Sequence, residues 1–220
     1  MKRLIIICEG ETEQEFCKDV LYPYFLSKGI VVSSPIIKKS KGGIVPWKEL
    51  KKQITSHLKE EWDVVVTTFI DFYGLYDKHG YPGFDSKAND HATVAKSTEE
   101  KMKVDINDEL SHRFIPYIQL HEFECFMFCS LDVLKANLKP EEADFNAIEE
   151  VINSYPNPED INNGTATAPS KRLKEHIPGY DKSIYGACLA KEIGLRRLRE
   201  KCLRFNEWII NLEKAGGCGM

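Results

Sequence analysis

Acidic side chains follow three apolar segments that have the composition of buried strands. They are Glu9, Asp71, Glu122 and Glu124. Because the carboxyl ends of parallel strands meet at one edge of a sheet, where ligands bind, these side chains are expected to lie close together. Carboxylates gathered in one crevice repel one another unless a cation compensates their charge. Oxygen ligands of this kind suit Mg²⁺ or Mn²⁺, which clamp phosphates, so the residues predict a metal-carboxylate site.

Four apolar, β-branched runs are predicted to form the strands of a parallel sheet that is buried on both faces. They are residues 4–8, 30–37, 64–70 and 114–120. The first strand leads into a helix, for which Thr12 is the expected N-cap, with Glu15 at the third helical position. Further helices are expected from Trp47 to Trp62 and near His91 to Leu110. This alternation predicts an α/β fold, mostly parallel, with helices on both faces of the sheet.

The acids at the strand ends also have a simpler interpretation. Asp and Glu are common at strand ends and at helix N-caps, so any one of them can be structural. Recurrence at three strand ends favours a shared site.

Almost only helical periodicity follows residue 121, apart from the loop from Tyr155 to Pro169 with its Pro, Asn and Gly residues. We therefore predict an α/β core over residues 1–128 and a largely helical C-terminal extension over residues 129–220, packed on the core. A long loop over residues 72–90 mixes aromatic with basic side chains. Such a loop can stack bases or can be pinned to the core by its aromatic rings, and both interpretations stay open.

Lys171 and Arg172 follow Pro169-Ser170 at the start of a predicted helix. Backbone N–H groups and two cations could hold a phosphate there, although an ordinary solvated basic turn is the alternative. Residues 166–205 carry ten Lys or Arg against four acids, whereas residues 121–163 carry ten acids against two Lys. A basic stretch beside the acidic crevice would position a nucleic-acid backbone while a metal ion supports the chemistry.

The overall composition indicates an ordinary globular protein. The chain has 220 residues and a formal net charge of −4, which argues against a protein that coats nucleic acid by charge alone. Its seven cysteines are scattered and form no C-x-x-C pair, which favours the reducing cytoplasm. The apolar run before Glu9 is too short for a signal peptide, and no segment has the roughly 18 apolar residues of a membrane helix, so no membrane association is expected.

One short segment has residue types that could bind zinc. His121, Cys125 and Cys129 recur every four residues, which would place them on one face of a helix. A fourth ligand is not evident and the segment is rich in Phe, so core packing is the favoured interpretation.

The string Cys8-Glu9-Gly10-Glu11-Thr12-Glu13 resembles the E-G-x-T-E signature of the Toprim superfamily, as found in overcoming-lysogenization-defect nucleases. Further segments, which span nearly the whole chain, are similar to a narrower Toprim-like group, domain-of-unknown-function family 4276, also called RloG-like. They are Thr67–Leu75, His121–Glu124, Pro169–Leu173 and Cys202–Phe205 with Trp208.

The resemblance implies a Toprim-like fold and Mg²⁺-dependent phosphodiester chemistry. It implies that Glu9 is the general acid/base or a metal ligand, and that Asp71 is a metal ligand. The second acid of the superfamily's D-x-D pair is replaced here by Tyr73, so Glu122 or Glu124 is expected to supply the missing ligand. Secondary candidates for the site are Glu13, Tyr73 and His121.

The expected function is therefore that of a nuclease acting on RNA or DNA, as the effector of a phage-defence system with an ATPase partner. Two alternatives stay open. One is a non-catalytic Toprim-like module that docks on an ATPase or restriction complex; the other is a phosphoesterase or phosphotransferase acting on a small substrate in a closed pocket. The oligomeric state is open as well, with a homodimer as one form.

Overall fold

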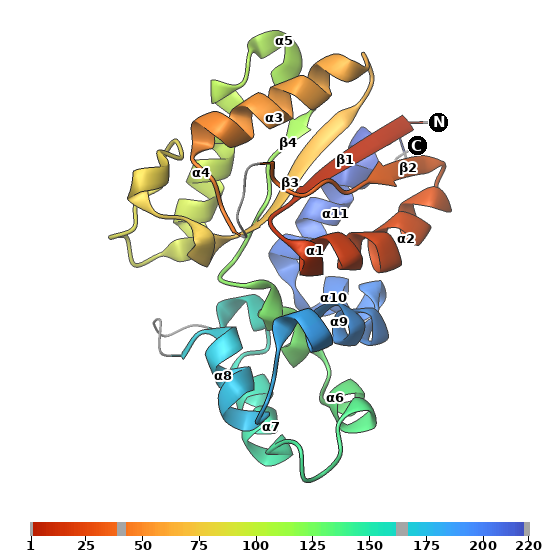
Figure 1. The fold of residues 1–220 in the computed structure, drawn as a ribbon, viewed down its shortest axis with the longest axis vertical. Coiled ribbons are helices and arrows are strands. Elements are labelled where there is room, and N and C mark those ends of the chain that lie inside the picture. The colour runs from red at the N-terminus through yellow and green to blue at the C-terminus, as the bar shows by residue number, and fades with distance from the viewer. Residues whose placement is uncertain (1, 39–42, 162–166, 218–220) are drawn as a thin grey trace. The chain divides into compact units, whose positions relative to one another are not determined.

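A computed structural model describes residues 2–38, 43–161 and 167–217. The chain divides into two compact units, which are described separately (Figure 1). Unit 1 consists of Met1–Leu120 and Trp208–Met220, and unit 2 of His121–Glu207. The division therefore falls at residue 120, where the sequence suggested 128, and the C-terminal segment belongs to the α/β unit.

Unit 1 is built on a five-stranded sheet in which every strand pair is parallel. The strands are β1 (Lys2–Cys8), β2 (Ile30–Ser33), β3 (Val65–Asp71), β4 (Phe114–Ile115) and β5 (Ile118–Gln119). Their order is β2-β1-β3-β4, and β5 also pairs with β3. The predicted α/β fold with a parallel sheet is confirmed.

The expected single strand over residues 114–120 is interrupted between β4 and β5. Pro116 has no N–H to donate to a sheet. The hydroxyl of Thr68 takes the place of the missing backbone hydrogen bonds between the strands. It accepts a hydrogen bond of 2.9 Å from the N–H of Tyr117 and donates one of 2.9 Å to the carbonyl oxygen of Tyr117. One edge strand thus becomes two short ones, both paired with β3.

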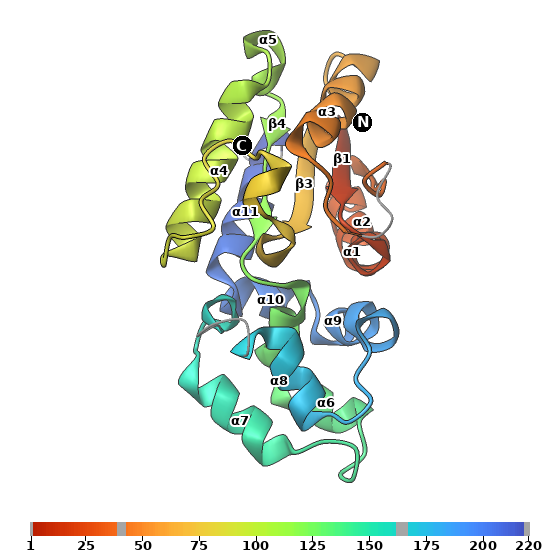
Figure 2. The same ribbon diagram turned by 60° about the vertical axis from the view of Figure 1, so that its left-hand side comes forward.

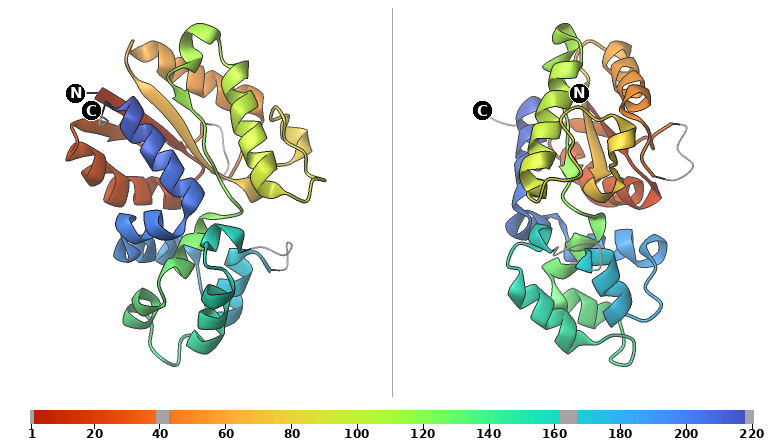
Figure 3. Two further views of the ribbon diagram at one scale, coloured as in Figure 1. Left: turned by 180° about the vertical axis from the view of Figure 1, so that it is seen from behind. Right: turned by 90° about the vertical axis from the view of Figure 1, so that its left-hand side faces the viewer.

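Helices cover both faces of this sheet. On one face α3 (Trp47–Glu60) and α4 (His91–Asp105) form a common core with Ile5 and Val66 (Figures 1 and 2). The other face carries α1 (Glu11–Phe16), α2 (Tyr22–Leu26) and the part of α11 (Leu203–Ala215) that follows residue 207 (Figure 3). There the ring of Phe69 contacts the ring of Trp208 at a centroid distance of 5.2 Å.

The start of the first helix differs from the prediction. Gly10 is the N-cap in place of Thr12, and Glu13 fills the role expected of Glu15, since its carboxylate accepts a hydrogen bond of 3.0 Å from the N–H of Gly10. The two candidate caps differ by two residues, and the sharp turn at Gly10 lets the helix begin earlier. A π-helical turn, η1 (Cys17–Leu21), then connects α1 with α2.

The segment between β3 and β4 contains short helices that the sequence did not predict. They are η2 (Phe72–Gly74), η3 (Asp77–His79) and α5 (Asp108–Ser111). The helix expected near residues 91–110 therefore ends at Asp105 and is followed by α5. Several aromatic rings of the 72–90 loop pack inward, as Tyr81 does against Trp47 at a centroid distance of 5.6 Å.

The described part of unit 2 contains helices joined by loops and no strand, which confirms the predicted, largely helical second half. Its elements are η4 (Phe123–Cys129), α6 (Leu131–Asn137), α7 (Phe145–Ser154), η5 (Pro158–Asp160), α8 (Pro169–His176), η7 (Lys182–Gly186), α9 (Ala187–Ile193), α10 (Leu195–Lys201) and the start of α11. Residues 162–166 lie outside the described residues. They include part of the loop predicted at residues 155–169 and the first residue of the basic stretch 166–205. None of the helices in the described segments has the length and apolar character needed to cross a membrane.

The centre of unit 2 is η4, whose seven residues are all buried. It is a 3₁₀ helix with three residues per turn, so a spacing of four does not place His121, Cys125 and Cys129 on one face. The Sγ atom of Cys129 instead lies 3.5 Å from that of Cys202, inside the core. All six described cysteines are free thiols, and Cys218 lies outside the described residues.

Candidate functional site

Glu9 lies where β1 leaves the sheet. Its N–H donates to the carbonyl oxygen of Phe69 at 3.0 Å, which extends the pairing of β1 with β3 by one residue. Its side chain turns toward the end of β3, where Oε2 accepts a hydrogen bond of 2.9 Å from the N–H of Asp71. The carboxylate is therefore held by the backbone of the neighbouring strand.

Asp71 is the last residue of β3, and it is 7% exposed. Its backbone binds Glu9, so the two acids lie side by side at the carboxyl ends of adjacent strands. This is the edge of a parallel sheet at which α/β proteins bind ligands. The structure thus brings together the two residues that the sequence ranked first.

Two glycines border the Glu9 carboxylate. A Cβ atom placed on Gly74 would lie 3.1 Å from Oε1 and 3.2 Å from Oε2 of Glu9. A Cβ atom on Gly43 would lie 3.9 Å from Oε1. Because an ordinary contact is longer than 3.4 Å, a side chain at residue 74 cannot be added without moving the carboxylate. Gly74 thus leaves the space that Glu9 occupies.

Tyr73 and Tyr81 follow Asp71 in the segment after β3. The hydroxyl of Tyr81 donates to the carbonyl oxygen of Val45 at 3.2 Å, and burial together with the negative charge of Glu9 raises the pKa of Tyr81. Tyr73, at the position of the expected second acid, packs edge-on against Phe72 and His91. Tyr81 therefore stays protonated near neutral pH, and the ring of Tyr73 packs at the position where the superfamily signature has a second acid.

Glu13, a secondary candidate, is buried and accepts the hydrogen bond from Gly10 that caps α1. His121, another secondary candidate, is also buried, and its backbone has a φ of 64°. A non-glycine residue with positive φ is uncommon and is found most often at sites where the surroundings enforce it. Glu13 thus has a structural role, while the backbone at His121 marks the start of unit 2.

Glu122 binds the first turn of α8. Its two carboxylate oxygens accept hydrogen bonds from the N–H of Ser170 at 2.9 Å and from the Ser170 hydroxyl at 3.0 Å. Negative charge at a helix N-terminus is favoured by the helix dipole. The end of α8 that the sequence assigned to a phosphate is therefore occupied by a carboxylate of the same unit.

Lys171 and Arg172 lie in this turn of α8. Lys171 is exposed, and its N–H donates to the carbonyl oxygen of Ala168. The Nε atom of Arg172 donates to the carbonyl oxygen of Thr167 at 3.0 Å, and its guanidinium lies 5.5 Å from the ring centroid of Tyr155. Lys171 is thus accessible to a ligand, whereas Arg172 is held by its own unit.

Glu124 forms an ion pair with Lys182, with 3.4 Å between Oε2 and Nζ. Burial raises the pKa of Glu124 and the nearby Lys182 opposes that shift, while Glu122 adds to it. Tyr180 is buried beside these groups, and among the described residues its hydroxyl has no hydrogen-bond partner. Glu124, one of the two acids expected to complete the metal site, is therefore already paired with Lys182, which the sequence analysis did not single out.

The predicted site residues thus form two groups, Glu9 with Asp71 in unit 1 and Glu122 with Glu124 in unit 2. Among the described residues, no three His, Cys, Asp or Glu side chains gather in a way that could hold a metal ion. That the two groups act on one ion stays a prediction.

Sequence reasoning also missed Glu159, which is wholly buried. Its oxygens accept hydrogen bonds from the N–H groups of Arg204 at 2.8 Å and Phe205 at 3.1 Å, in the first turn of α11. The partners lie 45 and 46 residues further along the chain, so no local sequence pattern predicts these hydrogen bonds.

The fold and the acid pair of unit 1 define a parallel α/β protein with carboxylates at the ends of adjacent central strands. Over residues 8–213 the sequence matches the family described as a domain of unknown function (DUF4276), and the chain belongs to this family. No curated protein and no solved structure matches the chain.

Proposed function

We propose that this protein is a Toprim-type nuclease that hydrolyses phosphodiester bonds of RNA or DNA with the help of Mg²⁺ or Mn²⁺. The observation that carries the proposal is the contact between Glu9 and Asp71 at the carboxyl ends of β1 and β3. The resemblance of residues 8–13 to the Toprim signature supports it. The resemblance further suggests a cytoplasmic phage-defence effector that works with an ATPase.

The donor set of this pair fits the proposed ion. Both residues supply carboxylate oxygens, the ligands that Mg²⁺ prefers. A bound Mg²⁺ would offset charge on the phosphate and lower the pKa of a water molecule. In this proposal Asp71 is a ligand, and Glu9 is either a ligand or the group that accepts and returns a proton. The hydrogen bond from the Asp71 backbone fixes the orientation of Glu9 for either role.

The experiment compares the cleavage of RNA and DNA panels in EDTA, Mg²⁺ and Mn²⁺ by the wild type and by Glu9→Gln and Asp71→Asn variants. Glu11→Gln is the matched control, because Glu11 is an exposed acid two residues from Glu9. Gln retains an oxygen that can accept the Asp71 N–H, so Glu9→Gln is expected to fold. We expect both variants to lose at least about 100-fold in rate, as is usual when a group that stabilises the transition state is removed. Undiminished cleavage in both variants would contradict the assignment.

A second candidate function is a non-catalytic module of an ATPase or restriction complex. It is favoured by the partners of Glu122 and Glu124, because Ser170 and Lys182 already satisfy the acids that were expected to complete the metal site. Calorimetric titration with Mn²⁺ separates the two candidates. Binding that is lost in Glu9→Gln supports the nuclease, whereas no binding and no cleavage by the wild type supports the module.

A further inference from the structure

We propose that lysines around the start of α3 hold the phosphate backbone of the nucleic-acid substrate beside Glu9. These residues, here called the α3 basic face, are Lys48, Lys51 and Lys52 of α3 and Lys38, whose backbone N–H donates to the side chain of Gln53 in α3 at 2.8 Å. The inference rests on the proposed function, since it names the surface of unit 1 that a nuclease substrate would contact.

Positive charge is concentrated in this part of the chain. Residues 38–52 contain six lysines and a single acid, Glu49. Four of the six lysines make up the α3 basic face, and the other two lie outside the described residues. A protein whose net charge is −4 needs such a local concentration to attract a polyanion.

The α3 basic face lies next to the candidate site. The segment that enters α3 borders Glu9, because Gly43 lies against its carboxylate and Val45 binds Tyr81, whose pKa the charge of Glu9 raises. Lys48 follows Gly43 by five residues, so its Cα atom lies within about 18 Å of the Cα atom of Gly43 even for a fully extended chain. A short stretch of nucleic acid can therefore contact Lys48 and Glu9 together.

These lysines are accessible. Lys48 and Lys52 are exposed, and among the described residues no ion pair involves Lys48. Lys52 pairs with Glu49 and Lys51 with Asp105, each at 2.9 Å, and the four side chains are between 29% and 61% exposed. Exposed pairs contribute at most about 1 kcal/mol, so a phosphate can replace them.

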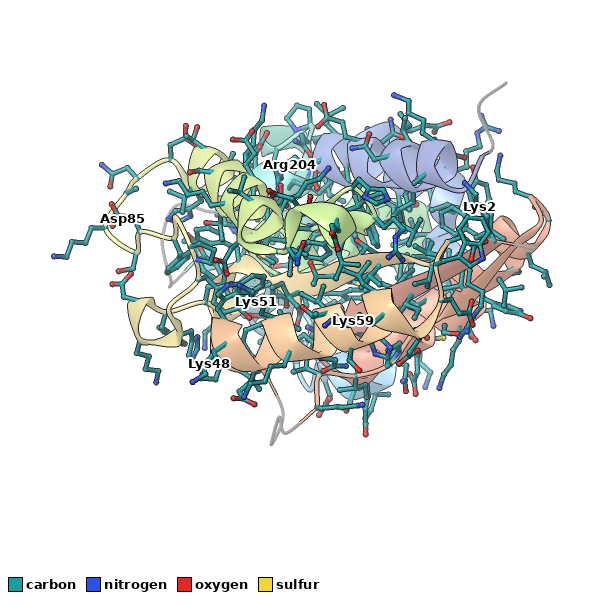
Figure 4. The ribbon with its side chains drawn as sticks, turned by 90° about the horizontal axis from the view of Figure 1, so that it is seen from above. Lys2, Lys48, Lys51, Lys59, Asp85 and Arg204 are labelled. Atoms are coloured by element: carbon teal, nitrogen blue, oxygen red, sulfur yellow. The ribbon has the colours of Figure 1, made fainter. Side chains whose placement is uncertain are left out.

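Figure 4 shows Lys48, Lys51 and Lys59 along α3, with Lys48 near the start of the helix. The dipole of a helix adds positive potential at its N-terminus. The potential of the helix and the charge of the lysines therefore favour an anion at the same end of α3.

Several arginines of unit 2 bind partners within that unit. The side chain of Arg196 binds Glu200, that of Arg197 binds Ser130 and that of Arg199 binds Asn206. Together with Arg172, they are engaged within their own unit. These contacts engage only part of the positive charge of residues 166–205, since Lys171 and the pair of Arg196 with Glu200 are exposed. The α3 basic face differs from that stretch because it adjoins the segment that borders Glu9.

The test measures the binding of a fluorescent single-stranded RNA or DNA oligonucleotide in EDTA, where no cleavage takes place. The test variant is Lys48→Glu/Lys52→Glu. The matched control is Lys96→Glu/Lys103→Glu, which reverses two exposed lysines of α4 and changes the net charge equally. A neutral variant, Lys48→Gln/Lys52→Gln, separates the loss of attraction from added repulsion.

We expect the test variant to bind at least about tenfold more weakly than the wild type, while the control stays within about twofold. The slope of log K against log salt should fall by about 1.4 in magnitude, since each lost phosphate contact on a single strand contributes about 0.7. Equal losses in both double variants would overturn the inference. Competition by polyglutamate as effective as by the oligonucleotide would also overturn it, because the surface would then fit an acidic protein.

The result is separable from that of the proposed function. Glu9→Gln is expected to bind the oligonucleotide as the wild type does and to fail only in cleavage. Tight binding through Lys48 and Lys52 without any cleavage would refute the nuclease and leave the binding surface intact. Cleavage with normal binding by the test variant would refute the surface and leave the nuclease intact.

Discussion

The backbone N–H of Asp71 donates a 2.9 Å hydrogen bond to the carboxylate of Glu9, 62 residues earlier in the chain. The contact uses the backbone of one acid and the side chain of the other. The side chain of Asp71 can therefore be changed without removing the group that orients Glu9. Asp71→Asn consequently tests the Asp71 carboxylate alone, whereas a change in the turn that follows Asp71 tests the placement of Glu9.

Gly74→Ala is the change that acts on this placement. The added methyl group would lie 3.1 Å from Oε1 of Glu9, which is too close, so the carboxylate must move by a few tenths of an ångström. The backbone of Gly74 does not require a glycine, because its φ is not in the left-handed region. We expect a loss of at least about tenfold in the cleavage rate with little change in the unfolding temperature, since small displacements of catalytic groups are costly.

The same substitution in the Glu9→Gln background provides the control. If Gly74→Ala acts through Glu9, it should cost little further activity there, because coupled residues are not additive. Full additivity of the two effects on the cleavage rate would show that Gly74 acts on something else.

The contact between Glu122 and Ser170 leads to a prediction about stability. Ser170→Ala removes the hydroxyl that donates to Glu122 and leaves the backbone bond in place. We expect a loss of about 1 kcal/mol in the free energy of unfolding, the usual contribution of one hydrogen bond. Chemical denaturation measures the loss, and hydrogen exchange of the α8 amides locates it.

Glu122→Gln distinguishes a cap from a metal ligand. As a cap of α8, Glu122 should couple energetically to Ser170, so the double variant should lose less stability than the sum of the single variants. If Glu122 chiefly binds metal, its replacement should abolish Mn²⁺ binding and leave the α8 amides protected. Both measurements can be made on the same samples.

The sheet of unit 1 was predictable because its strands are buried on both faces. A strand of this kind is a short, nearly continuous run of apolar and β-branched residues, as at residues 64–70. The juxtaposition of Glu9 and Asp71 followed from the rule that parallel strands end at one edge. Both predictions rest on local patterns combined with one general property of parallel sheets.

Contacts between distant segments were not predictable in this way. Nothing near Glu122 in the sequence indicates that its carboxylate binds Ser170, 48 residues away, or that Lys182 balances Glu124. Gly10 and Thr12 are both possible N-caps of the first helix. Which of them caps it depends on where β1 ends. The partners of a buried polar group are set by tertiary packing, which periodicity does not encode.

Glu159 gives a prediction about pH. Burial raises the pKa of Glu159 to about 7, even though hydrogen bonds from the N–H groups of Arg204 and Phe205 oppose the shift. In the unfolded chain a glutamate has a pKa of about 4.3. Between these values the folded chain binds the proton more tightly, so the contribution of Glu159 to the free energy of unfolding rises as the pH falls from about 7 to about 4.5.

Glu159→Gln removes this dependence. The free energy of unfolding of the wild type minus that of the variant should increase by an amount on the order of 2–3 kcal/mol when the pH falls from 8 to 5, since each pKa unit corresponds to about 1.4 kcal/mol. Urea denaturation of both proteins at several pH values measures it. Parallel pH curves for the two proteins would contradict the prediction, because they would show that Glu159 has the same pKa in the folded and the unfolded chain.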